Sequence, residues 1–196
     1  MSLAIALHRD PDHYALASDS RCLGHLGGMH HETLKIHRIG AWFVAYTGAI
    51  IGGQRMIAAL QADTTSTLPH GVDLARATSR LGAEIAIGRA FAAVIPDCGS
   101  HNPGDFPGVG VDLLIVGPPG IAVMAAQGSI HWRPAGERYW AIGCADGYAM
   151  GWLDNCPINE AIPREGGDSQ TLIDCIERAA LRYPGVGGAT VVLEVG

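Results

Sequence analysis

The chain contains little charge and few aromatic residues. Charged residues make up 16% and aromatic residues 6% of the 196 residues, whereas apolar residues make up 48%. A disordered segment has the opposite balance, so we expect a compact globular protein. The net charge of -6 lacks the basic surplus that nucleic-acid binding requires, which argues against a nucleic-acid partner. At this length we expect a single domain over residues 1–196.

Long apolar runs are also missing. The longest, residues 113–126, is interrupted by Gly117-Pro118-Pro119-Gly120, whereas a membrane-spanning helix needs about 20 unbroken residues. The apolar start of the chain is too short for a secretory signal, and we expect no membrane partner. The five cysteines are an odd number without a CxxC pair. This pattern favours reduced thiols and a cytoplasmic location over a disulfide framework.

Several common catalytic motifs are absent. The sequence contains no GxSxG, Walker A or GxGxxG motif. His31-Glu32 begins like a zincin motif but has no second histidine at the required spacing. His25, His30 and His37 lie near His31, in or beside a glycine-rich segment without carboxylates at ligand spacing. We therefore expect solvated histidines, no metal and no cofactor.

Hydrophobic periodicity predicts the order of the elements. Predicted strands span 2–8, 13–19, 33–39, 41–47, 111–116, 121–126, 139–142 and 189–195, and predicted helices span 49–63, 72–94, 148–153 and 171–181. Residues 21–32, 66–69 and 96–110 are predicted as loops. Runs of strands alternating with pairs of helices indicate two antiparallel sheets packed face to face with helices outside. The predicted fold class is α+β, a four-layer αββα sandwich.

Lysine occurs once, at position 35, among 13 lysine and arginine residues. Arginine stays protonated in proteins, whereas the pKa of lysine shifts readily on burial. Lys35 lies in the predicted strand 33–39, and Asp19 ends another predicted strand. A carboxylate at that strand end could pair with Lys35 across the sheet. The alternatives are an ordinary exposed lysine and an aspartate that caps the following turn.

Ser2 becomes the first residue if Met1 is removed. It then carries a hydroxyl and a free α-amine, whose pKa is ordinarily about 7.7–8.0. Such an amine can take the proton of the hydroxyl, directly or through a water, which activates a terminal nucleophile. Serine is frequent after the initiator methionine, so Ser2 by itself does not identify an active site.

Taken together, these residues resemble the proteasome β-subunit family, which includes the bacterial HslV-type peptidases, within the N-terminal-nucleophile hydrolases. Each matching motif is short, and the resemblance rests on the order and spacing of the set. The motifs are Ser2–Leu7 with Ala15–Arg21, Thr33–Ile36, Ala45–Ala49, Val111–Gly117 and Ala141–Ala149.

The resemblance implies a role for each matching residue. Ser2 stands where the family usually has a threonine nucleophile, Lys35 would activate it, and Asp19 would orient Lys35. The backbone N–H of Gly48 would donate to the oxyanion, and Cys144 would support the site where a serine is usual. Substrate would lie as an added strand along residues 21–23 and 46–48. One enzyme residue would lie near the pocket that receives the substrate side chain before the cleaved bond. The implied substrate-binding residues are Arg21, Cys22, Tyr46, which is the residue near that pocket, and Thr47.

The resemblance also implies a function. It indicates a peptidase that hydrolyses peptides or unfolded proteins inside a homo-oligomeric ring, and such a ring needs an unfolding partner such as an ATPase cap. Two alternatives stay open. The first alternative is a catalytically inactive ring subunit or scaffold, and the second is a small-molecule amidohydrolase on the same fold.

Overall fold

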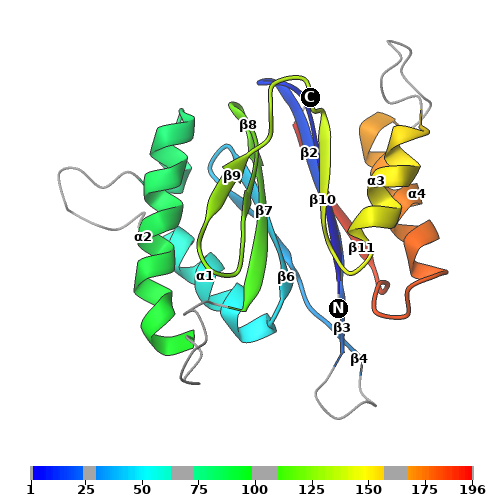
Figure 1. Cartoon of the computed structure of the whole chain (residues 1–196), viewed down its shortest axis with the longest axis horizontal. Coiled ribbons are helices and arrows are strands. Elements are labelled where there is room, and N and C mark those ends of the chain that lie inside the picture. The colour runs from blue at the N-terminus through cyan, green and yellow to red at the C-terminus, as the bar shows by residue number, and fades with distance from the viewer. Residues whose placement is uncertain (1, 24–29, 63–72, 99–109, 157–166, 196) are drawn as a thin grey trace.

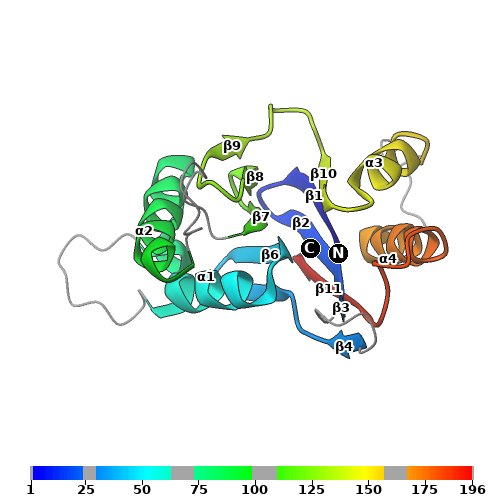
Figure 2. The ribbon, with the colours of Figure 1, turned by 60° about the horizontal axis from the view of Figure 1, so that its bottom comes forward.

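The computed structural model describes residues 2–23, 30–62, 73–98, 110–156 and 167–195. Over these ranges the elements form four layers, with two sheets in the middle and a pair of helices on each outer side (Figure 1). The view in Figure 2 shows the same order of layers. The predicted α+β fold class, an αββα sandwich, is confirmed.

The first sheet is antiparallel and has the strand order β10-β1-β2-β11. Its strands are β1 (Leu3–Asp10), β2 (His13–Asp19), β10 (Tyr139–Gly143) and β11 (Thr190–Val195). Helices α3 (Asp146–Asp154) and α4 (Gly167–Ala180) cover its outer face. The β1–β2 hairpin is the one predicted from the sequence.

The second sheet is also antiparallel and has the strand order β5-β6-β7-β8-β9. Its strands are β5 (Ile36–Ile39), β6 (Trp42–Gly48), β7 (Val111–Gly117), β8 (Gly120–Met124) and β9 (Ile130–Trp132). Helices α1 (Ile50–Ala62) and α2 (Arg80–Cys98) and the 3-10 turn η2 (Leu74–Arg76) lie against its outer face.

Strand alternation sends the side chains of β6 into two different cores. Trp42, Val44 and Tyr46 pack toward α1 and α2, whereas Phe43 and Ala45 pack between the two sheets. Both sheets are therefore buried on two faces, which explains why their strands are so apolar. The same alternation places successive residues at the end of β6 on opposite sides of the sheet.

Four local predictions are wrong. The predicted strand 33–39 begins only at Ile36, because residues 33–35 carry the chain across from a separate small ladder to the second sheet. That ladder joins β3 (Arg21–Leu23) to β4 (His30–Glu32), inside the segment predicted as a loop. The predicted helix 72–94 is divided, since Asp73 caps η2 and α2 begins later, at Arg80, and then extends through Pro96 into the predicted loop. β9 was not predicted.

Some predictions fall on residues outside the described ranges. These are the removal of Met1, the placement of His25, the loop 66–69 and most of the loop 96–110. None of the helices within the described ranges is long and apolar enough to span a bilayer.

Candidate active site

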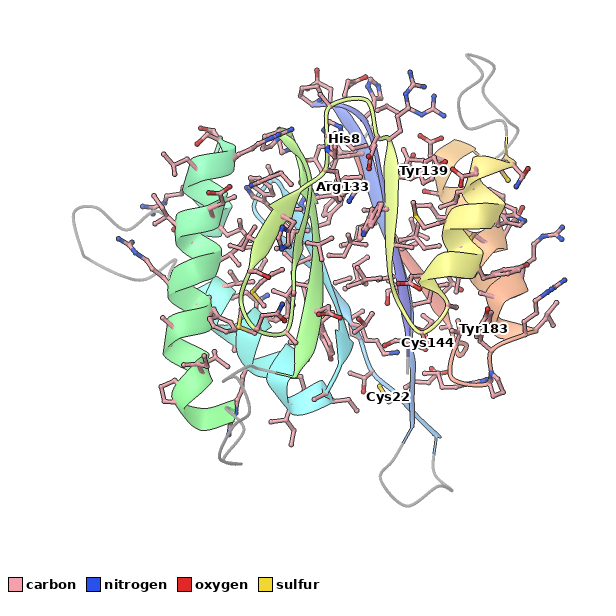
Figure 3. All side chains as sticks on the ribbon, in the orientation of Figure 1. His8, Cys22, Arg133, Tyr139, Cys144 and Tyr183 are labelled. Carbon is pink, nitrogen blue, oxygen red and sulfur yellow. The ribbon has the colours of Figure 1, made fainter. Side chains whose placement is uncertain are left out.

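Two hollows open at one end of the sandwich and share Ser2 and Gly48. Figure 3 shows Cys22 and Cys144 at this lower end, and His8, Arg133 and Tyr139 at the opposite end. The Lys35 hollow is lined by Ser2, Arg21, Cys22, Lys35, Tyr46, Gly48 and Ile50. The Asp112 hollow is lined by Ser2, Thr47, Gly48, Ala49, Gly110, Val111, Asp112, Ala126, Gly143 and Cys144.

The backbone holds Ser2 from two sides. The Ser2 carbonyl oxygen accepts the Cys144 N–H at 3.0 Å, and the next N–H, that of Leu3, donates to Asp19 Oδ1 at 2.9 Å. Gly143 makes the first contact possible, because a Cβ at that position would lie 2.1 Å from the Ser2 oxygen and its φ is +117°. Ser2 is 4% exposed, so its position is fixed at the mouth of both hollows.

Asp19 and Lys35 form a buried ion pair. Lys35 Nζ lies 3.2 Å from Asp19 Oδ1, and both side chains are at most 3% exposed. Lys35 Nζ also donates to the Arg21 carbonyl oxygen, while Asp19 Oδ2 accepts the Gly187 N–H at 3.2 Å. The predicted pairing is therefore present, and the alternative of an exposed lysine is wrong.

The charges of this pair depend on each other. Burial raises the pKa of the Asp19 carboxyl, while Lys35 and the N–H donors of Leu3 and Gly187 act to lower it. Without the ammonium, a carboxylate would remain in a site that excludes water, which is strongly destabilising. The pair thus keeps a positive charge at a defined place in the hollow that Ser2 lines.

The Gly48 N–H is directed into the Lys35 hollow. The Tyr46 N–H bonds to the Lys35 carbonyl oxygen at 3.1 Å, and N–H groups two residues apart on a strand point to the same side. β5 pairs with β6 only as far as Ala45, so within the described part of the chain no partner strand covers this edge at Gly48. Gly48 has φ +110°, and a Cβ there would lie 2.5 Å from the Gly110 oxygen. A donor in this setting can stabilise a developing oxyanion.

Tyr46 lines the Lys35 hollow, which is small. Its side chain is 1% exposed, and its ring lies so close to α1 that a Cβ at Gly53 would be 2.2 Å away. The remaining volume is about 30 Å³, room for one or two water molecules. The Tyr46 hydroxyl has no hydrogen-bond partner among the described residues, and burial raises the pKa of Tyr46 to about 12.

The other substrate-binding candidates lie in different places. Cys22 lines the Lys35 hollow and Thr47 the Asp112 hollow. The Arg21 guanidinium donates to the carbonyl oxygens of Pro184 and Val186, so the turn at 184–187 holds its head group. Cys144 is exposed and lines the Asp112 hollow. The structure thus brings all nine predicted site residues to one end of the molecule, but divides them between two hollows and the network behind them.

Sequence reasoning missed three residues that contribute to the site, namely Ser20, Gly187 and Asp112. Ser20 Oγ accepts the Ala189 N–H at 2.8 Å, which together with the Gly187–Asp19 contact fixes the final turn behind the ion pair. These contacts join residues about 168 positions apart in the chain, so no local sequence pattern predicts them. Asp112 did leave a signal, because it is an acidic residue at the start of an otherwise apolar strand.

Comparisons with solved structures support the fold described above. No protein-family model matches the chain, and no curated protein sequence matches it. Among solved structures, BPH from Thiobacillus denitrificans in complex with epoxomicin is 20% identical, covers 98% of this chain and 99% of its own, and has a TM-score of 0.67. The helical assembly of the Anbu complex from Pseudomonas aeruginosa gives 17% identity, 98% and 80% coverage, and a TM-score of 0.73. Eukaryotic HslV from Trypanosoma brucei gives 12% identity, 97% and 98% coverage, and a TM-score of 0.62.

These likenesses extend over almost the whole chain at low sequence identity, which makes them evidence of fold. They agree with the layer order. The chain therefore has the proteasome-like N-terminal-nucleophile hydrolase fold that proteasome β-subunits and HslV share.

Proposed function

We propose that this protein is a proteasome-like peptidase whose nucleophile is Ser2, freed by removal of Met1. The observation that carries the proposal is the double role of Asp19. One of its oxygens accepts both the Leu3 N–H, next to Ser2, and the ammonium of Lys35. A single buried carboxylate thereby fixes the start of the chain and the only lysine relative to each other.

The residues of the Lys35 hollow fit amide hydrolysis through an acyl-enzyme. Ser2 Oγ attacks the carbonyl carbon of the scissile amide, and its proton passes to the free α-amine of Ser2, directly or through a water. The Lys35 charge favours the neutral form of that amine and the oxyanion of the nucleophile. The Gly48 N–H donates to the carbonyl oxygen as it becomes negative.

The second half of the reaction returns Ser2 to its starting state. The carbon–nitrogen bond breaks, the leaving amine takes the proton from the Ser2 ammonium, and an ester with Ser2 Oγ remains. A water then attacks that ester while the α-amine accepts its proton, which releases the carboxylic acid and restores the hydroxyl. Cys144 contributes through its N–H, which holds the Ser2 carbonyl oxygen.

The substrate in this proposal is a peptide or unfolded protein bound along residues 21–23 and 46–48. The peptidase would act inside a homo-oligomeric ring, fed by an ATPase cap, in the cytoplasm. The free thiols of Cys22, Cys144 and Cys175 fit a reducing compartment. Since the Anbu complex named above forms a helical assembly, light scattering combined with electron microscopy of the purified protein distinguishes a closed ring from an open helix.

The decisive experiment is intact-mass analysis followed by labelling. The purified protein should lack the mass of Met1 and should gain the mass of one peptide vinyl sulfone, which Ser2 Oγ attacks at its alkene. Ser2→Ala should abolish labelling, whereas Ser169→Ala, a serine on α4, should label like the wild type. Failure of the Met1-free wild-type protein to label would refute the proposal.

A ring subunit without activity is the second candidate. The observation that favours it is that the Asp19–Lys35 pair also ties together β1, β2, residue 21 and the final turn, a purely structural task. Lys35→Arg separates the two functions, because it retains the charge and changes the geometry. A Met1-free protein that cleaves no peptide, and in which this change alters stability alone, would favour the inactive subunit.

A further inference from the structure

The two hollows that Ser2 lines, built from described residues, differ greatly in the space they offer to a side chain. The Lys35 hollow, which Tyr46 helps to line, offers about 30 Å³, whereas the Asp112 hollow offers about 420 Å³. Ligand sites in proteins usually fall between about 300 and 1,000 Å³. A peptide bound with its scissile carbonyl at Gly48 can therefore place a small side chain in the Lys35 hollow and a large one in the Asp112 hollow.

The larger hollow carries one kind of charge. Asp112 is the only charged residue among the described residues that line it. Within the described ranges no arginine, lysine or histidine forms an ion pair with Asp112. This contrasts with Lys35, which lines the other hollow and forms an ion pair with Asp19. The charge of Asp112 is thus available to a ligand.

The Asp112 carboxylate is held in place from one side. Its Oδ1 accepts the Ala126 N–H at 2.9 Å, and strand pairing sets Asp112 opposite Thr47, one residue before Gly48. The side chain is half-buried, so a cation placed against it is partly shielded from water. Charge-assisted hydrogen bonds to a carboxylate are roughly twice as strong as neutral ones.

We propose that Asp112 makes its hollow a subsite for the positively charged side chain of an arginine or lysine close to the scissile bond of the substrate. The inference rests on the proposed function, since it names the class of peptide that the Ser2 site would take. It assigns recognition to the Asp112 hollow and leaves the Lys35 hollow to the reacting groups and a small side chain.

The test is a binding measurement that does not need cleavage. Fluorescent peptides of small neutral residues carry one arginine, scanned over four positions on each side of a fixed alanine pair. A matched set carries citrulline, which has nearly the shape of arginine without its charge. Fluorescence anisotropy with the Ser2→Ala protein should show arginine binding about tenfold tighter than citrulline at one position, the size of one charge-assisted hydrogen bond.

Three further measurements assign that preference to Asp112. Asp112→Asn keeps an oxygen for the Ala126 N–H but removes the charge, and the arginine-to-citrulline ratio should fall to near one. Asp174→Asn removes the same charge from α4, away from both hollows, and should retain the ratio. In the Ser2→Ala protein with Asp112 intact, the ratio should fall as sodium chloride rises from 50 to 500 mM, a measurement that does not depend on how well Asp112→Asn folds.

The outcomes separate the two proposals. Equal binding of arginine and citrulline at every position, or a preference that survives Asp112→Asn, overturns the role of Asp112. The absence of Ser2 labelling in the vinyl sulfone experiment overturns the peptidase, and the anisotropy result still decides whether the hollow binds a cation.

Discussion

The two hollows that meet at Ser2 differ in size, in charge and in what fills them. The Lys35 hollow is crowded, because it is small and its lining includes the buried Tyr46 and Lys35 of the buried ion pair. The Asp112 hollow is about fourteen times larger, 420 against 30 Å³, and has one unneutralised carboxylate among its described lining residues. In the proposed peptidase, the groups that must be held rigidly for chemistry would lie in the Lys35 hollow, and the Asp112 hollow would serve recognition.

Adjacent residues of one strand produce this difference. Tyr46 and Thr47 follow each other at the end of β6, and strand alternation sends the first toward α1 and the second toward the space between the sheets. Gly48, the next residue, lines both hollows. A substitution at one of these three positions therefore acts on one hollow, on the other, or on both.

The largest expected effect follows from Lys35→Met, which removes the cation of the Lys35 hollow. Peptide cleavage should fall at least about 100-fold, as for the loss of a group that assists proton transfer. The unfolding free energy should fall by about 3–5 kcal/mol, because Asp19 is left buried and unpaired. Cleavage of a fluorogenic peptide and urea denaturation measure the two effects.

A double variant separates chemistry from stability in that experiment. Asp19→Asn with Lys35→Met removes both charges, so most of the lost stability should return while cleavage stays low. If cleavage returned together with stability, Lys35 would be a structural residue only, and the difference in task between the two hollows would disappear.

Gly48→Ala should have the next largest effect, since Gly48 lines both hollows. A Cβ at φ +110° and 2.5 Å from the Gly110 oxygen must displace the backbone, so the N–H leaves its position and cleavage falls by about 10²-fold. The matched control is Gly88→Ala in α2, where a Cβ meets no atom of the described residues within 4 Å. The control should cleave at the wild-type rate, and equal rates for the two variants would exclude Gly48 as the oxyanion donor.

Tyr46→Val should reduce the difference in size between the two hollows by enlarging the Lys35 hollow. A leucine before the cut should then gain about tenfold over an alanine at the same position, because burying a leucine side chain is worth about 1.5–3 kcal/mol. The measurement is kcat/KM for two fluorogenic peptides that differ at that residue. Tyr14→Val, a similar truncation between the sheets, should leave the ratio of the two values unchanged.

The sequence predicts the strands and the layer order around this site better than it predicts the two hollows. Alternation and the turn residues are local signals, and they sufficed for most strands and for the layer order. The rarity of lysine directed attention to Lys35, and the Asp19 pairing followed from its place at a strand end. The segment 33–35 was misassigned because its backbone partners, Ser20 and Tyr46, lie on other elements.

The hollows themselves depend on tertiary packing. Their sizes follow from where the Tyr46 ring meets Gly53 on α1, and from the approach of Gly143 to the Ser2 oxygen. Neither contact has a local pattern in the sequence. Asp112 was visible as a polar residue in an apolar strand, but its place beside Ser2 required the pairing of β7 with β6.

The smallest expected effect concerns the Tyr46 hydroxyl and appears only at alkaline pH. The pKa of Tyr46 is raised from 10 to about 12, because burial disfavours the phenolate in the fold. The neutral hydroxyl therefore contributes stability that is complete below pH 10 and is lost as the pH rises toward 12. At pH 11 the wild type should have lost about 1 kcal/mol more unfolding free energy than Tyr46→Phe, relative to pH 8. Tyr139 and Cys175, whose pKa values are also raised to about 12, titrate alike in both proteins and cancel in this difference.

At pH 8 the variant should be at least as stable as the wild type, since it lacks a buried hydroxyl without a described partner. Parallel curves for the two proteins from pH 8 to 11, measured by urea denaturation, would mean that water reaches the hydroxyl and that the crowded hollow is more open than its 30 Å³ indicates.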